Sequence, residues 1–174
     1  MARFIIGVIC TLGLLAVAGS AYVYSGAFDV AASRPHGAFA RWLLGTAMKR
    51  SVVARAAGVP EPPHFTAEMV MAGFRHYDEM CTDCHGGPGI EQSEIGRGLN
   101  PRPPDLARAV KDWTPRQLFW IIKHGVKMTG MPSFGVTHSD AQVWSIVAFI
   151  ERLPKISAEQ FRLMRQTMHQ PENR

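Results

Sequence analysis

Two cysteines and a histidine lie close together in the stretch CTDCHGGP, residues 81–88. Two thiols separated by two residues can bind zinc, exchange a disulfide or attach a haem covalently. A zinc site needs further Cys or His ligands, but Cys10 lies in an apolar stretch and the remaining histidines form no H-x(3–5)-H pair. A redox pair of the thioredoxin kind follows a strand, whereas the residues before Cys81 have helical spacing. The pattern therefore favours haem attachment.

In a C-x-x-C-H motif the two thiols form thioether bonds to the haem, and the following histidine binds the iron. The spacing matters because both sulfur atoms must reach one edge of the macrocycle while the imidazole approaches along the iron axis. The sequence therefore predicts Cys81 and Cys84 as the thioether residues and His85 as the proximal iron ligand.

The elements around this motif are predicted to be helices. Residues 66–80 place apolar side chains at helical spacing and run directly into Cys81. Capping boxes, in which Ser or Thr precedes Gln by three residues, predict three further helix starts. They are TPRQ at 114–117, SDAQ at 139–142 and SAEQ at 157–160. Because no alternating strand pattern of useful length occurs, the predicted fold class is all-α.

The segment between these helices, from Gly86 to Asp105, is rich in Gly and Pro and has little helical or strand period. A loop of this length without secondary structure is uncommon inside a compact domain. We expect such a loop if it wraps a group that is not protein, which agrees with a bound haem.

Residues 66–155 resemble the class I c-type cytochromes, a family of monohaem helical proteins. The family pattern G-x-x-x-Y/F-x-x-x-C-x-x-C-H is present as Gly73, Tyr77 and the CTDCH motif. GMPSFG at 130–135 resembles the family's distal-ligand motif. Phe149 is the aromatic residue expected on the last helix of the domain, which Gly73 allows to cross closely. The resemblance implies an all-α fold around one covalently bound haem.

The resemblance implies that Met131 is the sixth iron ligand, opposite His85. A neutral thioether favours ferrous iron, so His/Met ligation raises the reduction potential. Met128, His124 and His138 are rival ligands, and packing in a loop or at a helix end is the competing interpretation of each.

The resemblance also implies partners around the haem. In the family, a proline carbonyl in the loop after the haem motif holds the proximal imidazole, and PRPPDL offers Pro103 or Pro104, of which we favour Pro104. Such a carbonyl fixes the tautomer and orientation of the ring. Candidate donors to the haem propionates, each equally interpretable as an ordinary surface or core residue, are Arg97, Asn100, Arg102 and Trp113.

The N-terminal segment, residues 1–28, has no charged residue from Phe4 to Phe28. About 20 apolar residues are enough to span a bilayer as a helix. A cleaved signal peptide is the alternative, but its apolar run usually has only about 7–15 residues. Tyr22 and Tyr24 suit a membrane interface, so we favour a retained anchor. The few basic residues near the span leave its orientation ambiguous.

Residues 29–64 are predicted to form a juxtamembrane segment with a helix over 36–57 and a proline-rich boundary at 59–64. Two interpretations of the helix stay open: it lies on anionic headgroups, or it packs on the main domain. The haem domain is predicted over 65–156 and a C-terminal helix and tail over 157–174. On the helix, one broad face carries Phe39, Trp42, Leu43, Ala47 and Val53, and Arg41, Lys49 and Arg55 lie opposite.

The charge distribution argues against nucleic acid as a partner. The net charge is +5, but residues 65–156 hold ten basic and ten acidic residues, and no stripe of aromatic and basic residues occurs. Within the domain, 78–94 carries five acids and no base, whereas 108–127 is mainly basic. This asymmetry is interpretable as steering of a redox partner or as an ordinary solvated exterior.

These observations predict a membrane-anchored monohaem c-type cytochrome that passes single electrons between redox protein partners and is not an enzyme. Because bacteria attach haem covalently outside the cytoplasmic membrane, the resemblance implies a single-pass inner-membrane protein whose haem domain faces the periplasm. One alternative is a haem subunit of a larger dehydrogenase or reductase complex. Another is a five-coordinate gas-binding or peroxidatic haem protein, which requires that Met131 does not bind iron. No small-molecule substrate is expected.

Overall fold

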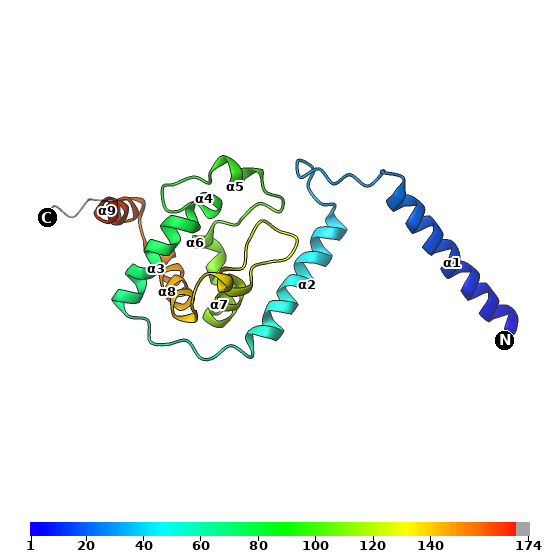
Figure 1. The fold of residues 1–174 in the computed structure, drawn as a ribbon, viewed down its shortest axis with the longest axis horizontal. Helices are drawn as coiled ribbons and strands as arrows, with labels where there is room; N and C mark the ends of the chain where they lie inside the picture. The colour runs from blue at the N-terminus through cyan, green and yellow to red at the C-terminus, as the bar shows by residue number, and fades with distance from the viewer. Residues whose placement is uncertain (170–174) are drawn as a thin grey trace. The chain divides into compact units, whose positions relative to one another are not determined.

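The computed structural model describes residues 1–169, and the chain divides into two compact units, Met1–Arg34 and the part that begins at Pro35. Every regular element in the described residues is a helix (Figure 1), and the sole β-type pairing there is an isolated bridge between Gly87 and Ile90. The all-α fold class is therefore confirmed.

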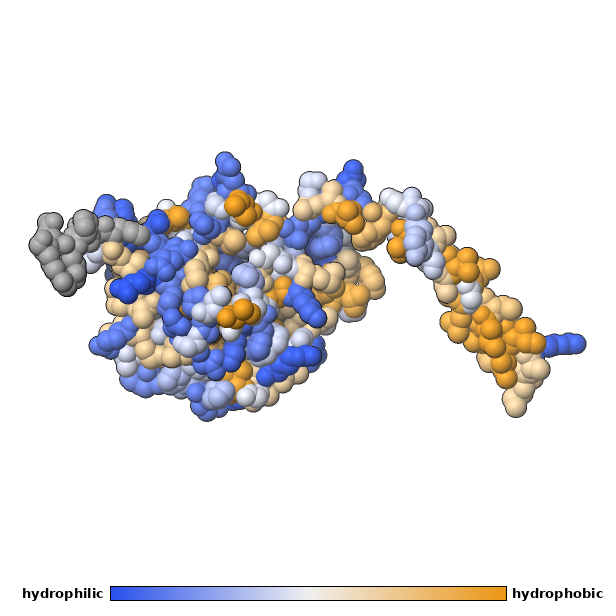
Figure 2. All heavy atoms as spheres, viewed as in Figure 1, coloured by the Kyte–Doolittle hydropathy of each residue, from blue (hydrophilic) through white to orange (hydrophobic). Residues whose placement is uncertain are grey.

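The first unit contains α1 (Ala2–Tyr24), a helix of 23 residues. At 1.5 Å per residue it is about 35 Å long, which exceeds the roughly 30 Å of a bilayer's hydrocarbon core. It is apolar along nearly its whole length (Figure 2), and none of its described residues is buried. By length and composition α1 is a candidate membrane span, and a signal sequence has the same properties.

The second unit begins with α2 (Ala38–Ala56), which packs against α7 (Pro115–His124). Its fully buried residues are Val52 and Ala56. The broad apolar face singled out in the sequence is turned to solvent, because Phe39 and Trp42 are 71% and 63% exposed. The helix thus packs on the domain, but through a narrow stripe of small and β-branched residues that allows close approach.

The centre of the second unit is the crossing of α3 (Ala67–Met80) with α8 (Asp140–Arg152), the most extensive contact between two helices in the described part of the chain. Gly73 lies at the crossing point. A Cβ atom there would lie 1.9 Å from the backbone oxygen of Ser145 and 3.0 Å from the Cβ of Phe149, so no larger residue fits. The close crossing predicted for Gly73 and Phe149 is present.

An aromatic cluster fills the space beside this crossing. Phe74, Tyr77 and Phe149 are fully buried, with ring centroids 5.1–5.3 Å apart in the pairs that Phe149 makes with the other two. The fourth member, Phe161, is also fully buried and lies on α9 (Ala158–His169), 5.4 Å from Phe74. The helix after the predicted haem domain therefore contributes to its core. The rest of the predicted tail, 170–174, lies outside the described residues.

The helix starts follow the capping signals. Thr114 and Ser139 both form complete capping boxes, with Gln117 and Gln142 respectively. Ser157 and Gln160 exchange the same two hydrogen bonds at the start of α9. These three predictions are confirmed.

The prediction of a loop without structure from Gly86 to Asp105 is wrong in one respect, because the segment contains α5 (Glu94–Gly98). Ser93 caps this helix by accepting a hydrogen bond from the Gly96 amide, 3.2 Å away. Five residues are too short to show a helical period, which is why the pattern missed it. The remaining short elements are α4 (Thr82–His85), α6 (Leu106–Ala109), η1 (Val110–Asp112), η2 (Phe134–Val136) and η3 (Leu153–Lys155).

Candidate functional site

The two thiols and the histidine lie on a single helical turn at the end of α3. Cys81 ends α3 and begins α4, and its carbonyl accepts a hydrogen bond from the His85 amide at 2.8 Å. Gly86 ends the turn with a φ of 69°, a conformation that favours glycine. The buried Tyr77 hydroxyl donates to the Gly86 carbonyl at 2.8 Å. Tyr77 therefore ties the end of the motif back onto α3.

Both thiols of the motif are free within the described residues, Cys81 buried and Cys84 partly buried. Burial, with a smaller contribution from the Cys84 charge, raises the pKa of Cys81 to about 12. Redox-active cysteines have lowered pKa values, whereas the pKa of Cys81 is shifted in the opposite direction. No group of three or more His, Cys, Asp or Glu side chains in the described part of the chain is arranged to hold a metal ion.

The imidazole of His85 is held by one specific contact. Its Nδ1 lies 2.8 Å from the carbonyl oxygen of Pro104, the contact that the resemblance implies for that residue. Because a carbonyl only accepts, the proton is on Nδ1 and the lone pair is on Nε2. Burial lowers the pKa of His85, and the hydrogen bond to Pro104 opposes this shift. A neutral ring with a free Nε2 is the form that binds a metal.

Gln92 links the two loops beside this histidine, a role that sequence reasoning missed. Its Nε2 donates to the Pro103 carbonyl at 2.7 Å, and its Oε1 accepts from Arg102 Nε at 2.6 Å. One glutamine thus ties the segment after the haem motif to the segment that holds Pro104. A single polar residue in a Gly/Pro-rich loop carries no pattern that would have revealed this.

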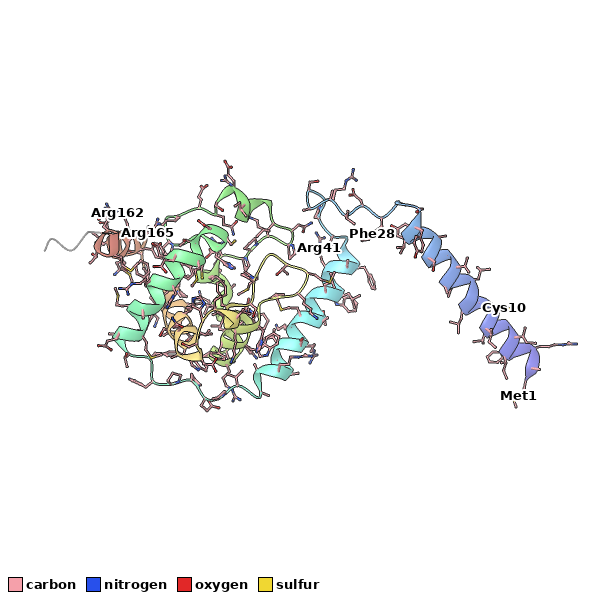
Figure 3. The ribbon with its side chains drawn as sticks, in the orientation of Figure 1. Met1, Cys10, Phe28, Arg41, Arg162 and Arg165 are labelled. Carbon is pink, nitrogen blue, oxygen red and sulfur yellow. The ribbon has the colours of Figure 1, made fainter. Side chains whose placement is uncertain are left out.

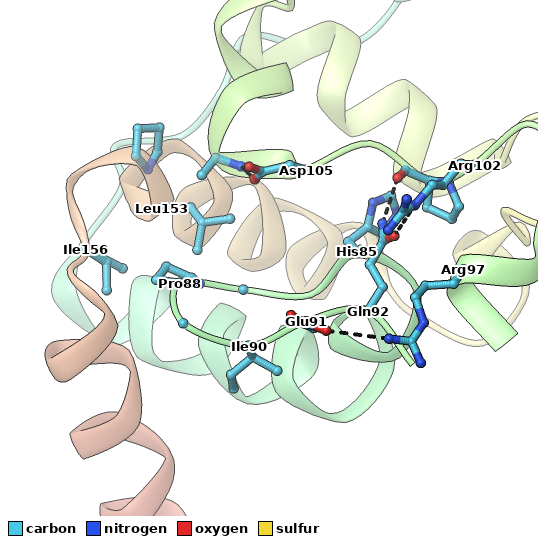
Figure 4. Close-up of a pocket in the computed structure, with 15 residues that line it drawn as sticks. His85, Pro88, Ile90, Glu91, Gln92, Arg97, Arg102, Asp105, Leu153 and Ile156 are labelled. Atoms are coloured by element: carbon cyan, nitrogen blue, oxygen red, sulfur yellow. Dashed lines mark hydrogen bonds and ion pairs between the residues drawn. The ribbon is translucent and has the colours of Figure 1, made fainter. Parts of the chain in front are cut away.

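A cavity of about 620 Å³ opens beside His85, and Figure 4 shows its lining. Arg97 and Arg102 both line it. Arg97 lies 3.5 Å from a carboxylate oxygen of Glu91, so its charge is only loosely paired. Of the other two predicted propionate donors, Trp113 packs against the hydrophobic core, and Asn100 is not among the residues that line this cavity.

Met131 lies in a tight turn after α7. Its amide donates to Thr129 Oγ1 at 3.1 Å, and its carbonyl accepts from the Val126 amide at 3.3 Å. Gly125 has a φ of 65°, and a Cβ there would lie 2.7 Å from the Met131 carbonyl oxygen. The turn therefore fixes the backbone of Met131, whose side chain is partly buried and packs against the core.

The three rival ligands occupy different surroundings. Met128 is 79% exposed and has a positive φ of 60°. His124 is exposed and its ring lies 4.9 Å from that of Trp120. His138 follows the end of η2 by two residues, and its ring lies 5.2 Å from that of His76. These are the loop and helix-end positions of the competing interpretation.

The comparison with protein families agrees with the geometry. The family model described as cytochrome c oxidase, cbb3-type, subunit III matches residues 68–150. Among solved structures, the chain is similar to one in the reducing HAO-like protein complex of Kuenenia stuttgartiensis, with 23% identity and a TM-score of 0.47. The match covers 53% of this chain and 47% of the other, so the chain spans about half that protein's length. No curated protein matches.

The residues of the motif fit the group that the family implies. Two free thiols one helical turn apart and a neutral imidazole with a free Nε2 are the groups that covalent attachment of a c-type haem requires. Residues 68–150 therefore match the c-type cytochrome domain of this family, which is similar to class I cytochromes, and such a domain indicates an electron-transfer haem protein rather than an enzyme.

Proposed function

We propose that the protein is a membrane-anchored monohaem cytochrome that passes single electrons between redox partners at the periplasmic side of a bacterial inner membrane. Cys81 and Cys84 would hold one haem through thioether bonds, and His85 and Met131 would be its axial ligands. The observation that carries the proposal is His85, whose ring is oriented by Pro104 one turn from two free thiols.

The bound haem would supply an iron that cycles between the ferrous and ferric states. Residues of this chain would orient the histidine ligand and adjust the reduction potential of the iron. Pro104 orients His85 and raises its basicity by accepting a hydrogen bond from its Nδ1–H. The uncharged thioether of Met131, if bound to the iron, would favour the ferrous state and so raise the potential. With His85 and Met131 both bound, a small substrate would have no place to bind at the iron.

The carboxylates of a bound haem need cations or donors. Arg97 and Arg102 have the best support, because both line the cavity beside His85. Asn100 and Trp113 are proposed as further donors, from the sequence alone.

The location follows from α1, which would be a retained anchor that holds the haem domain on the periplasmic side. Covalent haem attachment outside the cytoplasmic membrane supports this side. Carbonate extraction of membranes tests the anchor: the haem-containing chain should stay in the pellet at full length. Release of a shortened chain into the supernatant would show that α1 is a cleaved signal.

Two measurements test the haem and its ligands. A pyridine haemochrome spectrum of the purified protein should show one haem per chain with two thioethers, and Cys84→Ala should leave one thioether. The oxidised protein should show the absorption band of Met-ligated iron, and Met131→Ala should remove it while Met128→Ala retains it. Rapid carbon monoxide binding by the reduced wild-type protein would instead favour a five-coordinate gas-binding protein.

A second function, a haem subunit of a larger oxidoreductase complex, is favoured by the matched family, which is named for an oxidase subunit. Purification from gently solubilised membranes separates the two. A stoichiometric catalytic partner would replace the independent carrier by the subunit.

A further inference from the structure

Helix α2 carries an apolar face that nothing in the described part of the chain covers. Phe39, Trp42 and Leu43 are 71%, 63% and 46% exposed, and Val53, further along the helix, is 46% exposed. Their spacing of three, four and fourteen residues places them on one side. The rings of Phe39 and Trp42 lie 5.9 Å apart. Such an exposed aromatic pair marks an interaction surface.

The charges of α2 indicate an anionic partner. The helix contains four basic residues and no acidic residue, and all four basic residues are exposed. Lys49 and Arg50 follow the aromatic pair by two turns. At about 100° per residue, Arg50 lies within the aromatic face and Lys49 lies about 80° from Phe39, so Lys49 is beside this face and not opposite it as the sequence pattern suggested. A helix with aromatic residues on one face and basic residues beside them is typical of segments that lie in the interface of an anionic bilayer.

The length of the connection argues for lipid as well. Residues 25–37 join α1 to α2. Fully extended, they reach at most about 45 Å. If α1 spans the membrane, as proposed above, the start of α2 stays within about 45 Å of the bilayer surface. The membrane is therefore the apolar, anionic surface that α2 meets at the highest local concentration.

We propose that α2 docks in the membrane interface, with Phe39, Trp42 and Leu43 among the lipid headgroups and Lys49 and Arg50 on anionic phosphates. This inference rests on the membrane anchor of the proposed function. Figure 2 shows apolar residues at the surface over α2, and the opposite side of the helix packs on α7.

Because α2 is attached to the cytochrome domain, docking of α2 would also orient the domain. Arg116 on α7 donates to the Ala57 carbonyl just after α2 and pairs with Glu61 at 2.7 Å. Val52 and Ala56 are buried. Because α2 is fixed to α7, docking would hold the cytochrome domain in one orientation to the bilayer. Electron exchange would then be confined to partners in, or on, the same membrane.

Spin labelling of the full-length, haem-containing chain tests the proposal. Thr46 is exposed and lies four residues from Trp42 and seven from Val53, so it shares their side. A nitroxide on Thr46→Cys, in a Cys10→Ala background, is placed in vesicles of phosphatidylcholine with phosphatidylglycerol. Power saturation then compares collisions with oxygen, which concentrates in lipid, and with a water-soluble nickel complex. A label on Lys155→Cys, an exposed residue of η3, is the control.

We expect the oxygen-to-nickel ratio at position 46 to be severalfold higher than at position 155. Lys49→Glu with Arg50→Glu should lower it, whereas Lys111→Glu with Lys127→Glu, the same change in net charge at exposed sites elsewhere, should not. A protein that inserts and contains haem, but whose label at 46 is fully aqueous, overturns docking alone. A protein that does not insert overturns the anchor as well. A label shielded in native membranes but aqueous in pure lipid overturns the lipid surface in favour of a protein partner.

Discussion

Helices α2 and α9 flank the cytochrome domain and differ in the burial of their aromatic residues. On α9 a single ring, Phe161, is fully buried against Phe74 and Tyr77. On α2 two rings, Phe39 and Trp42, stay mostly exposed although the helix packs on α7. The number of aromatic residues on a helix therefore does not decide whether they are buried. A ring is buried where the domain has a space that fits it, and α3 and α8 leave such a space for Phe161.

The two helices differ in their ion pairs as well. Arg165 of α9 lies 2.7 Å from the carboxylate of Asp78, whose side chain is 3% exposed, and Figure 3 labels Arg165 and Arg162 on this helix. Arg116 also lies 2.7 Å from its partner, Glu61, near the end of α2, but the Glu61 side chain is 81% exposed. Equal distances thus describe a buried pair and a solvated one, and their removal should have unequal effects.

The largest expected effect comes from Phe161→Ala. Truncation of a fully buried phenylalanine should lower the free energy of unfolding by about 3–5 kcal/mol. Phe39→Ala on α2 is the matched control and should change it by no more than about 0.5 kcal/mol. Guanidinium denaturation of the haem-containing protein in detergent, followed by circular dichroism, measures both. Equal losses would show that α2 and α9 do not differ as described.

The second effect is that of the ion pairs. Arg165→Met leaves the Asp78 carboxylate buried without this partner and should cost about 2 kcal/mol, below the range for a fully buried pair because Arg165 is partly exposed. Glu61→Gln should cost less than about 1 kcal/mol. The same denaturation curves measure both, and a cost at Glu61 as large as that at Arg165 would contradict the distinction.

Much of the domain was predictable from sequence because its signals are local. Thr114 and Ser139 mark helix starts through bonds to residues three positions away. The spacing of Gly73, Tyr77 and the CTDCH motif specifies how α3 presents the haem-binding turn. The contact between His85 and Pro104 is longer in range, and it was expected through the family resemblance rather than through any local pattern.

The parts that were missed depend on tertiary contacts. Gln92 bridges two loops, and nothing in its neighbours signals that role. Phe161 was placed in a C-terminal segment because SAEQ showed where its helix starts but not what the helix covers. On α2, periodicity identified an apolar face but could not tell which side meets α7, since Val52 and Ala56 are small and few.

A third prediction tests that narrow contact on α2. Ala56→Leu adds three carbon atoms to a buried position and should cost about 1–2 kcal/mol through overpacking. Ala54→Leu, two residues earlier and exposed, should be nearly neutral. Denaturation again compares the two. A neutral Ala56→Leu would mean that α2 is only loosely attached, and docking could not then orient the domain.

The smallest effect concerns a site on neither flanking helix, where His76 of α3 lies beside His138, with Glu79 and Arg75 nearby. Burial first, and then the charge of His138, lower the pKa of His76. The unfolded chain therefore binds this proton at higher pH than the folded chain, so stability should fall as pH drops through about 6.5 and level off below the folded value. Since His76 is partly exposed, solvent screening should keep this loss small. His76→Gln should remove this part of the pH dependence in denaturation curves between pH 7.5 and about 5.

Because His76 lies on neither flanking helix, the pH dependence of stability that it causes should be the same in the Phe161→Ala and Phe39→Ala proteins. A pH dependence that disappears with Phe161→Ala would instead mean that α9 controls the surroundings of His76.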